Sequence, residues 1–475
     1  MNQYQKLLAL GFVITQVFVS CSCRKQYADA QFSNIRNVEN TFLINGFYTV
    51  SMFEYAPVTE KLTLCRKWNT NGYYTGSGAI YYPDKDVVFT PYGFKQEGPD
   101  NIGNPAYQGM LVLMADGTQK QIEFSQADGF NGSEYLYPYG QNRLLISHSI
   151  FRKAPIDPNL GYLDSVEYSY SDNINTDVAI GKKVKIAQKT PQHIFMYSSV
   201  FDMDAQRITQ SLKLPLSDKA EIFDRYLYEN VGSSFIKVDL TNGTRELFLK
   251  DISYPEVNQP RKLTHKPRGE EDFGMPSGYQ FFVNNTYYAI SESNAYNVCD
   301  KTNQIGVRPP NARLLGGWES NSIYRFDQQQ DLFTKVYTFP TDDFGYMLSP
   351  NNRDIVLFDR KSGNVYSYNT QNKTAQTYHF NNQGYSVFRV TYNKDFYFVL
   401  LEQEPHSDYT YNNVAVAIVP RNMQGSTKIF KLANADVPSS AEYSVISTPY
   451  FVSNGAYKCF RSDFAPAPTG YKRKR

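Results

Sequence analysis

Hydrophobic and polar positions alternate along most of this chain, and the alternation is clearest between Ser320 and Phe380. Tyr324 and Phe326 stand between polar neighbours, a polar run follows, and Phe333 resumes the pattern. Further alternating segments, cut by Asn, Asp and Gly, continue to Phe380. A period of two, rich in aromatic and β-branched residues, is typical of consecutive β-hairpins. We therefore predict roughly one and a half blades of a β-propeller in this stretch.

The same pattern begins at Gly46 and continues through most of the chain. Polar turns separate the alternating segments, and the clearest of them lie at Asp116-Gly117 and Asn242-Gly243. Asp-Gly and Asn-Gly between alternating hydrophobic residues are strong hairpin signals. The sequence therefore predicts antiparallel strands joined mainly by hairpins.

Four segments depart from this pattern. Residues 219–228 have helical apolar spacing and are compatible with a helix or a short strand. Residues 152–192 are rich in Pro, Gly and Lys, and we expect an elaborated loop with one or two strands there. Residues 251–276 and 296–318 are expected to be long loops.

Hairpins of similar form recur at intervals of roughly 40–50 residues or twice that value, the length of a four-stranded propeller blade. A lone sheet leaves both faces uncovered, whereas stacking the sheets in a closed ring covers them. The ring closes when the N-terminal and C-terminal strands share a blade. We therefore predict an all-β fold: a β-propeller of about seven or eight blades, mostly of four antiparallel strands. The predicted propeller covers residues 46–463, and tandem β-sandwiches are the alternative.

Composition supports a folded β protein and argues against a nucleic-acid partner. Hydrophobic residues make up 41% of 475 positions, and Tyr 39 and Phe 32 favour strands. The net charge is only +2, from 48 basic and 46 acidic residues. This balance gives no support to binding of a polyanion. We interpret residues 464–475 as a solvated basic C-terminal tail.

The first 23 residues predict a targeting segment. Lys6 supplies a positive charge, and Leu7–Val19 is apolar but too short to span a bilayer comfortably. The segment ends at Ser20-Cys21, which resembles the lipobox of bacterial lipoproteins. Phe18 stands where that family usually has Leu, Val or Ile.

The resemblance implies that residues 1–20 are a signal peptide and that Cys21 becomes the lipid-modified N-terminus. Residues 21–45 would then form a lipidated tether. Ser22 after the cysteine implies a bacterial outer-membrane address, with the periplasmic or surface face left open. The membrane is thus an expected partner through the lipid anchor. Soluble secretion and an uncleaved anchor are the alternatives.

The remaining cysteines match no zinc-binding pattern. Apart from Cys23 in the leader region, they are Cys65, Cys299 and Cys459. Buried small hydrophobic residues are one interpretation. A Cys65–Cys459 disulfide is another, if the two ends of the chain meet in a closing blade.

The sequence contains none of the common nucleophile, zinc-protease or phosphate-binding motifs. Its five histidines are scattered. The acidic pairs Asp202/Asp204 and Asp342/Asp343 fall in turns or polar loops, where turn formation accounts for them. We therefore predict no catalytic residue, no metal site and no cofactor.

Three loops combine aromatic rings with amide or charged side chains. Flat rings beside such groups suit sugars, whose C–H faces stack while the hydroxyls find polar partners. Packing of both tryptophans between blades is the alternative. The candidate ligand-binding residues are Trp68, Tyr73, Tyr74, Arg308, Arg313, Trp318, His406 and Tyr409.

The leading hypothesis is a non-enzymatic envelope lipoprotein whose propeller loops bind a glycan, a small ligand or a partner protein. A second hypothesis is a carbohydrate-active lyase or hydrolase on a propeller scaffold. A third is a structural subunit of a larger envelope complex. Propellers host many unrelated functions, so the fold alone does not decide among these hypotheses.

Overall fold

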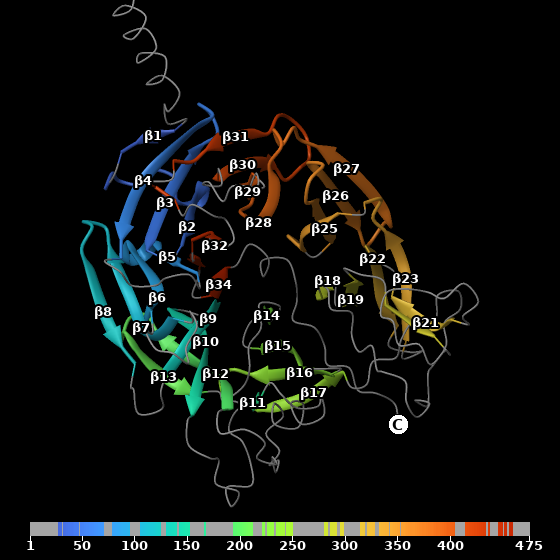
Figure 1. Cartoon of the computed structure of the whole chain (residues 1–475), viewed down its shortest axis with the longest axis horizontal. Coiled ribbons are helices and arrows are strands. Elements are labelled where there is room, and N and C mark those ends of the chain that lie inside the picture. The colour runs from blue at the N-terminus through green and yellow to red at the C-terminus, as the bar shows by residue number, and fades with distance from the viewer. Residues whose placement is uncertain are drawn as a thin grey trace, which may run out of the picture.

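The chain folds almost entirely into β-strands. The computed structural model describes residues 27–458 except for 31, 47, 71–77, 96–104, 125–129, 140–141, 153–165, 168–192, 212–220, 224–225, 232–233, 243, 250–279, 284–285, 292–294, 299–313, 319–320, 328–331, 342, 352, 404–413, 434–435, 438–444, 450 and 454–455. In this part of the chain the helical elements are two short 3-10 helices, η2 (Val38–Asn40) and η3 (Pro83–Lys85). Seven of the described sheets have four or five strands, and they follow one another in chain order (Figure 1).

Sheet 1 joins the two ends of the described chain. It contains β1 (Ala28–Asp29), β2 (Thr41–Asn45), β3 (Thr49–Ala56), β4 (Lys61–Asn69) and β32 (Val445–Ser447). β32 pairs antiparallel with β2, placing Ile446 opposite Ile44, and β1 pairs parallel with β4. The expectation that N-terminal and C-terminal strands share a sheet is therefore confirmed.

The folded region also begins before Gly46. β1 and β2 lie within the range 21–45 that the sequence assigned to a tether, so that boundary is wrong. β2 belongs to the sheet because its apolar side chains Phe42, Leu43 and Ile44 are fully buried.

Sheets 2, 3 and 4 follow along the chain. Sheet 2 contains β5 (Ile80–Tyr82), β6 (Val87–Lys95), β7 (Pro105–Met114) and β8 (Gln119–Glu123). Sheet 3 contains β9 (Phe130–Tyr139), β10 (Arg143–Arg152), β12 (His193–Asp202) and β13 (Arg207–Ser211), with β11 (Val166–Glu167) also paired to β12. Sheet 4 contains β14 (Glu221–Phe223), β15 (Tyr226–Val231), β16 (Ser234–Asp239) and β17 (Arg245–Leu249). The described residues of the ambiguous segment 219–228 therefore lie in strands, β14 and the start of β15, rather than in a helix.

Sheets 5, 6 and 7 complete the series. Sheet 5 contains β18 (Gln280–Val283), β19 (Thr286–Ser291), β22 (Ser322–Asp327) and β23 (Leu332–Thr338). Sheet 6 contains β24 (Phe344–Leu348), β25 (Asp354–Asp359), β26 (Asn364–Asn369) and β27 (Thr374–His379). Sheet 7 contains β28 (Ser386–Tyr392), β29 (Phe396–Glu402), β30 (Val414–Pro420) and β31 (Lys428–Lys431). Two smaller pairs are β20 (Ala295–Val298) with β21 (Leu314–Trp318), and β33 (Phe451–Ser453) with β34 (Ala456–Lys458).

Two predictions about this region have different outcomes. Ser320–Phe380 contains the last two strands of sheet 5 and all four of sheet 6, so the expected pattern of hairpins is confirmed. Residues 296–318 are not simply a loop, because most of β20 and all of β21 occupy the two ends of this range.

Equivalent turns close hairpins in different sheets. In sheet 3, Asp202 Oδ1 accepts the backbone N–H groups two and three positions later, at 2.9 and 2.7 Å. In sheet 6, Asn369 Oδ1 makes the same two bonds at 3.0 and 3.1 Å. Four positions after each, Gln206 and Lys373 have positive φ angles of 51° and 59°. Asp202 therefore lies in a side-chain turn that closes a hairpin, as the sequence predicted.

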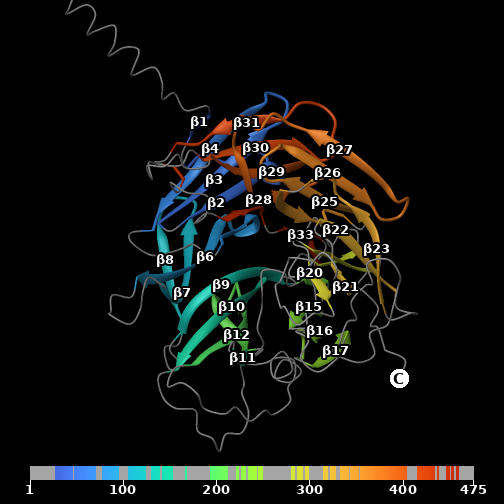
Figure 2. The same cartoon turned by 45° about the vertical axis from the view of Figure 1, so that its right-hand side comes forward.

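The core consists of several layers between neighbouring sheets. Separate buried clusters join sheets 1 and 2, 2 and 3, 5 and 6, 6 and 7, and 7 and 1. Figures 1 and 2 show the N-terminal sheet, in blue, beside the C-terminal sheet, in red-brown. Sheet 7 therefore covers one face of sheet 1, and sheet 2 covers the other.

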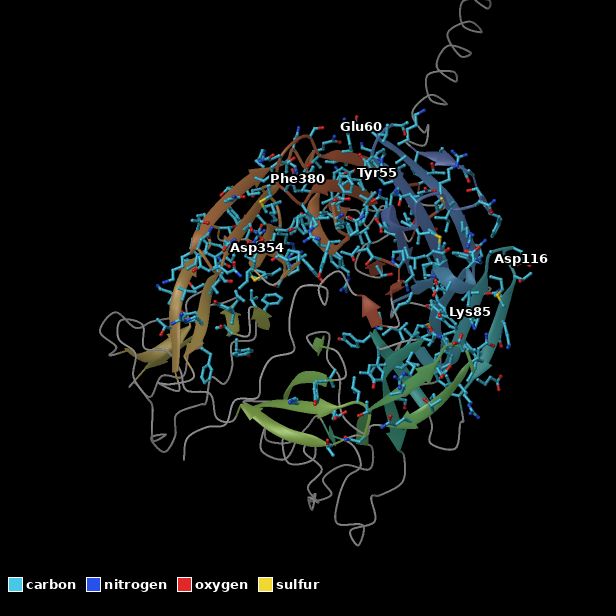
Figure 3. All side chains as sticks on the ribbon, turned by 180° about the vertical axis from the view of Figure 1, so that it is seen from behind. Tyr55, Glu60, Lys85, Asp116, Asp354 and Phe380 are labelled. Atoms are coloured by element: carbon cyan, nitrogen blue, oxygen red, sulfur yellow. The ribbon has the colours of Figure 1, made fainter. Side chains whose placement is uncertain are left out.

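A similar contact recurs at the outer side of these layers. Near its end, the fourth strand of one sheet meets the end of the third strand of the next. The pairs are Trp68 Nε1 to Met114 O at 2.8 Å, Phe124 to Phe201 at 6.1 Å between ring centroids, Tyr337 to Tyr368 at 4.9 Å, and Phe430 to Tyr55 at 6.2 Å. Figure 3 shows Tyr55 and Glu60 near each other at the border between sheets 7 and 1. The border that joins the chain ends therefore uses the same contact as the borders within the chain.

Candidate functional site

The strand order gives each sheet two unlike edges. Turns between the first and second strands, and between the third and fourth, lie at one edge because consecutive strands are antiparallel. We call this the turn edge; it includes turns 83–86, 115–118, 203–206, 370–373 and 393–395. Connections from the second to the third strand lie at the opposite edge. The first strand of each sheet also begins at this opposite edge, which we call the loop edge.

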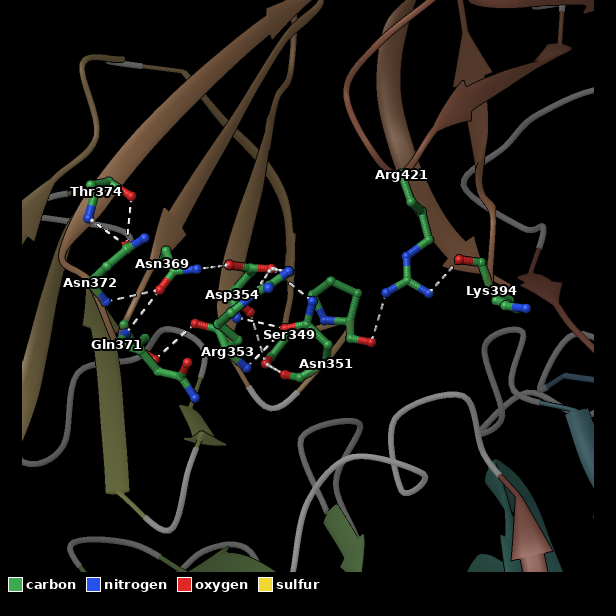
Figure 4. Close-up of polar contacts among 12 residues, drawn as sticks. Ser349, Asn351, Arg353, Asp354, Asn369, Gln371, Asn372, Thr374, Lys394 and Arg421 are labelled. Carbon is green, nitrogen blue, oxygen red and sulfur yellow. Dashed lines mark hydrogen bonds and ion pairs between the residues drawn. The ribbon is translucent and has the colours of Figure 1, made fainter.

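Arg421 holds the turn edges of sheets 6 and 7 together (Figure 4). Its guanidinium donates to Pro350 O of sheet 6 at 3.1 Å and to Lys394 O of sheet 7 at 3.2 Å, as Figure 4 shows. It also donates to Asn393 O of sheet 7 at 2.5 Å. The same group lies over the ring of Tyr392, with 5.3 Å from Cζ to the ring centroid. The two turn edges are therefore on the same side of the molecule.

Asp354 organises the turn edge within sheet 6. Its two carboxylate oxygens accept hydrogen bonds from Asn351 Nδ2 at 2.7 Å and Asn369 Nδ2 at 2.9 Å. Arg353 forms an ion pair with the same carboxylate at 3.1 Å. Because both oxygens are engaged in bonds within the sheet, we interpret Asp354 as a structural residue.

The loop edge of sheet 6 is connected to the chain segments that lead into sheets 6 and 7. Asn382 Nδ2 donates to Lys361 O, between β25 and β26, and to Tyr385 O, each at 2.6 Å. The Arg360 backbone N–H donates to Asp343 O at 3.1 Å. These bonds join the segments that precede β24 and β28 to the connection between β25 and β26.

The long connections within sheets are found at the loop edge. Second and third strands are separated by residues 96–104 in sheet 2, 153–192 in sheet 3, 292–321 in sheet 5 and 403–413 in sheet 7. At the turn edge, the longest connection between two strands is 421–427, between β30 and β31. Loops carried by a rigid scaffold are where binding residues concentrate. The loop edge is therefore the candidate functional face.

The loops proposed from the sequence all connect strands at this edge. Tyr73 and Tyr74 fall between β4 and β5, Arg308 and Arg313 between β20 and β21, and His406 and Tyr409 between β29 and β30. These six residues, like Cys21, lie outside the described residues. Trp318 is the last residue of β21, where it pairs with Ala295.

Trp68 is a core residue, so its assignment as a ligand-binding residue is wrong. Its side chain is 2% exposed and belongs to the cluster between sheets 1 and 2. Its indole N–H is bound to Met114 O at 2.8 Å. The alternative that this tryptophan packs between sheets is confirmed, because β4 extends to Asn69 and carries Trp68 into the layer.

Arg66, in the same segment, is part of a buried polar group that the sequence did not indicate. Its guanidinium makes two bonds to Asp86, at 2.6 and 2.8 Å, and Tyr81 Oη donates to Asp86 Oδ1 at 2.6 Å. Burial and the bond to Asp86 raise the pKa of Tyr81 above its ordinary value. Burial alone would raise the pKa of Asp86, but hydrogen bonds from Arg66 and Tyr81 outweigh it, and the pKa is lowered. This group connects sheets 1 and 2.

His379 and Cys65 have polar neighbours within the fold. His379 Nδ1 lies 3.0 Å from Asn364 Oδ1 in a hairpin of sheet 6. Cys65 is a buried free thiol within 3.7 Å of Glu54 Oε2, and Cys459 lies outside the described residues. Within the described ranges, no group of three or more His, Cys, Asp or Glu side chains is arranged to hold a metal ion. No helix among these residues is long and apolar enough to cross a membrane.

Comparisons with known proteins identify no family for this chain. No family model matches it, and no curated protein matches it. One similar solved structure is a chain from a Saccharomyces cerevisiae complex of Dbp5 with Nup159 and Gle1, at 12% identity and TM-score 0.37, covering 86% of this chain and 90% of that one. Another is the dihydro-heme d1 dehydrogenase NirN, at 10% identity and TM-score 0.32, covering 90% and 79%. At these scores neither similarity carries an argument about fold or function.

Proposed function

We propose that sheets 1–7 are the blades of a closed seven-bladed β-propeller. Three observations support this arrangement: buried layers between sheets consecutive in the chain, the pairing of β32 with β2, and the recurrent contact between fourth and third strands. Sheet 4 would occupy the position between sheets 3 and 5. Closure leaves no sheet face uncovered, and each blade keeps only short edges.

The proposed address is the bacterial outer membrane, with a lipid on Cys21. The support is the leader, in which an apolar segment of sub-membrane length is followed by Ser20-Cys21. Mass spectrometry of the mature N-terminus should find a diacylglyceryl thioether on Cys21. Replacement Cys21→Ala should leave the protein uncleaved and without lipid.

We infer that the loop edge binds a glycan, a small ligand or a partner protein without catalysing a reaction. The observation that carries this inference is the clustering of the long connections on one edge, among them the loops bearing Arg308, Arg313, His406 and Tyr409. The turn edge offers a different chemistry, since turn residues such as Asp354 and Asn369 already bind one another. A ligand would therefore meet aromatic and cationic side chains on one face only.

The test uses full-length protein on a glycan array, together with capture from detergent-solubilised envelopes. Replacements Arg308→Ala, Arg313→Ala, His406→Ala and Tyr409→Ala should weaken binding, with at least one falling more than about tenfold. Lys373→Ala, an exposed change at the turn edge, is the matched control and should bind as the parent does.

Other results would contradict the assignment to this face or indicate a different function. Equal binding by all loop-edge variants, or an equal loss in Lys373→Ala, would overturn the assignment to this face. Release of a shortened sugar product would replace the binding function with a lyase or hydrolase. Recovery of stoichiometric envelope proteins, with no glycan bound, would identify a subunit of an envelope complex.

A further inference from the structure

The innermost strand of sheet 7, β28, contains a bulge at Phe388. In its pairing with β29, Val387 lies opposite Leu401 and Arg389 lies opposite Leu400, so Phe388 is the extra residue. Strict alternation would place Arg389 on the same face as Val387, and the bulge moves it to the other face. Because residues directly opposite each other share a face of the sheet, Arg389 lies on the face of Leu400.

That face of sheet 7 is turned toward sheet 1. Leu400 belongs to the buried cluster between sheets 7 and 1, and Phe388 packs against the same cluster. The strand β28 contacts β32, the innermost strand of sheet 1. Figure 1 shows β31 on the outer side of sheet 7, and β28 and β32 on the inner sides of their sheets. Arg389 therefore lies at the inner end of the layer between sheets 7 and 1, where it is partly exposed.

Sheet 6 has the same bulge with a different side chain. In β24, the innermost strand of that sheet, Gly345 is the extra residue and Tyr346 lies opposite Phe358. Tyr346, at the position equivalent to Arg389, packs against the apolar layer between sheets 6 and 7. Sheet 7 thus has a cation where sheet 6 has an uncharged ring.

This cation has no partner within the described part of the fold. Arg66, Arg389 and Arg421 each have a buried Nε that makes no hydrogen bond. Arg66 and Arg421 bind protein oxygens through their terminal nitrogens. Among the described residues, Arg389 forms no ion pair, and its guanidinium lies over the Phe388 ring, 5.5 Å from Cζ to the ring centroid. A partly buried charge is unfavourable without a counter-charge, and an anion from outside the chain would supply one.

The position of Arg389 fits a ligand that arrives at the loop edge. The strand β28 begins at that edge with Ser386, three positions before Arg389. Thr391, two positions after Arg389, lies on the same face and is also partly exposed. A guanidinium can bind a carboxylate through two parallel hydrogen bonds, and a nearby hydroxyl can bind a hydroxyl of the same ligand.

We propose that Arg389 binds the carboxylate of an acidic sugar that enters the inner side of sheets 7 and 1 from the loop edge. The proposal rests on the glycan binding proposed above and specifies the charge of the glycan. It also gives a role to a cation that forms no bond within the described fold.

Calorimetric titration of the full-length protein tests the charge of the ligand. The probes are oligosaccharides of galacturonate, mannuronate and sialate, each beside its carboxyl-reduced neutral counterpart. The parent should bind at least one acidic probe about tenfold or more tighter than the neutral counterpart, and Arg389→Gln should remove this preference. Arg353→Gln, at an exposed arginine of the turn edge, is the matched control and should retain the preference.

Unfolding in urea gives a second test that needs no ligand. Because Arg389 has no partner among the described residues, Arg389→Gln should have a urea midpoint equal to or above that of the parent. A lower midpoint would show that the arginine stabilises the fold and would overturn the proposal.

The outcomes distinguish this proposal from glycan binding itself. Binding of neutral glycans alone, or an acidic preference that survives in Arg389→Gln, would overturn the role of Arg389 and leave glycan binding in place. Binding of no sugar, acidic or neutral, would overturn glycan binding and the role of Arg389 together.

Discussion

Tyr27 and Asp436 meet across the junction between the two ends of the described chain. The tyrosine hydroxyl donates to Asp436 Oδ2 at 2.6 Å, across a sequence separation of 409 residues. The same hydroxyl accepts the Ala433 backbone N–H at 3.0 Å, and Lys67 Nζ lies 3.4 Å from Asp436 Oδ1. Asp436 is only 2% exposed. This buried carboxylate therefore reinforces the junction that the pairing of β2 with β32 makes at the backbone.

Replacement Tyr27→Phe should destabilise the fold. It removes a buried hydrogen bond to a charged group, which contributes about 1.5–3 kcal/mol, and leaves the ring packing in place. Urea unfolding followed by circular dichroism measures the loss. Tyr48→Phe at an exposed position is the control, with an expected change within about 0.5 kcal/mol. Equal stabilities of the two variants would show that the Tyr27 contact does not contribute.

Trp68→Phe should reduce stability without affecting ligand binding. The change leaves Met114 O without the indole donor and opens space in the layer between sheets 1 and 2. Met114 O keeps its bond from the Gly117 backbone N–H at 3.1 Å, so the lost hydrogen bond costs about 0.5–1.5 kcal/mol, and the space left in the layer adds to this loss. The measurements are the urea midpoint and, on the same sample, binding of whichever ligand the array identifies. A loss of binding at unchanged stability would restore Trp68 as a ligand residue.

Asp86 should contribute stability that is lost in acid. Burial alone would raise its pKa, but hydrogen bonds from Arg66 and Tyr81 lower it below the ordinary value near 3.8. A carboxyl whose pKa is lower in the folded protein stabilises the fold above the unfolded pKa, and this contribution disappears as pH falls through the folded pKa. Stability measured from pH 5 to pH 2 should therefore fall less steeply in Asp86→Asn than in the parent.

The Asp86 substitution also has an expected effect at neutral pH. Asp86→Asn should cost about 1–2 kcal/mol, at the lower end for charged hydrogen bonds because the Asp86 side chain is 45% exposed. Asp84→Asn, at an exposed carboxylate in the same turn, is the matched control and should change stability at neutral pH by less than about 0.5 kcal/mol. Parallel acid profiles for parent and Asp86→Asn would contradict the assignment.

The hairpins could be predicted because their signals are local. The turn at Asp116-Gly117 joins β7 to β8 as expected, since Gly117 has a positive φ of 89° and Asp116 Oδ1 binds the Thr118 N–H at 2.9 Å. Alternation of period two likewise marks which strand residues share a face. These features depend on neighbours in sequence, and so a single sequence contains them.

The candidate site was less predictable because burial between sheets depends on distant partners. Trp68 follows two basic residues and resembles an exposed loop residue, yet its neighbours Leu111 and Leu113 come from another sheet. The early strand β2 was not predicted for the same reason. Polar residues flank its short apolar segment, and its pairing partner β32 lies near the other end of the described chain. The common edge of the long loops follows from strand order, which alternation alone does not supply.

Cys65 should remain an unreactive thiol until the protein unfolds. Burial, with a smaller contribution from the charge of Glu54, raises the pKa of the Cys65 thiol to about 12. Because a thiolate is the reactive form, iodoacetamide at pH 8 should modify Cys65 in urea and not in the native protein. Peptide mapping distinguishes this site from the other cysteines. Native-state labelling at the rate of an unfolded cysteine, or no labelling in urea because of a disulfide, would contradict the buried free thiol.

The same thiol gives the fold a predictable alkaline dependence. Its pKa rises from an ordinary value of 9.0 in the unfolded chain to about 12 in the folded one. The stability it contributes is therefore complete below pH 9 and decreases as pH rises toward 12, by at most about 1.4 kcal/mol per pH unit. Between pH 9 and 10 the free energy of unfolding should fall more steeply in the parent than in Cys65→Ala, because the tyrosines are the same in both proteins and their titration cancels in the comparison. Identical slopes in this interval would mean that Cys65 titrates alike in the folded and unfolded chains.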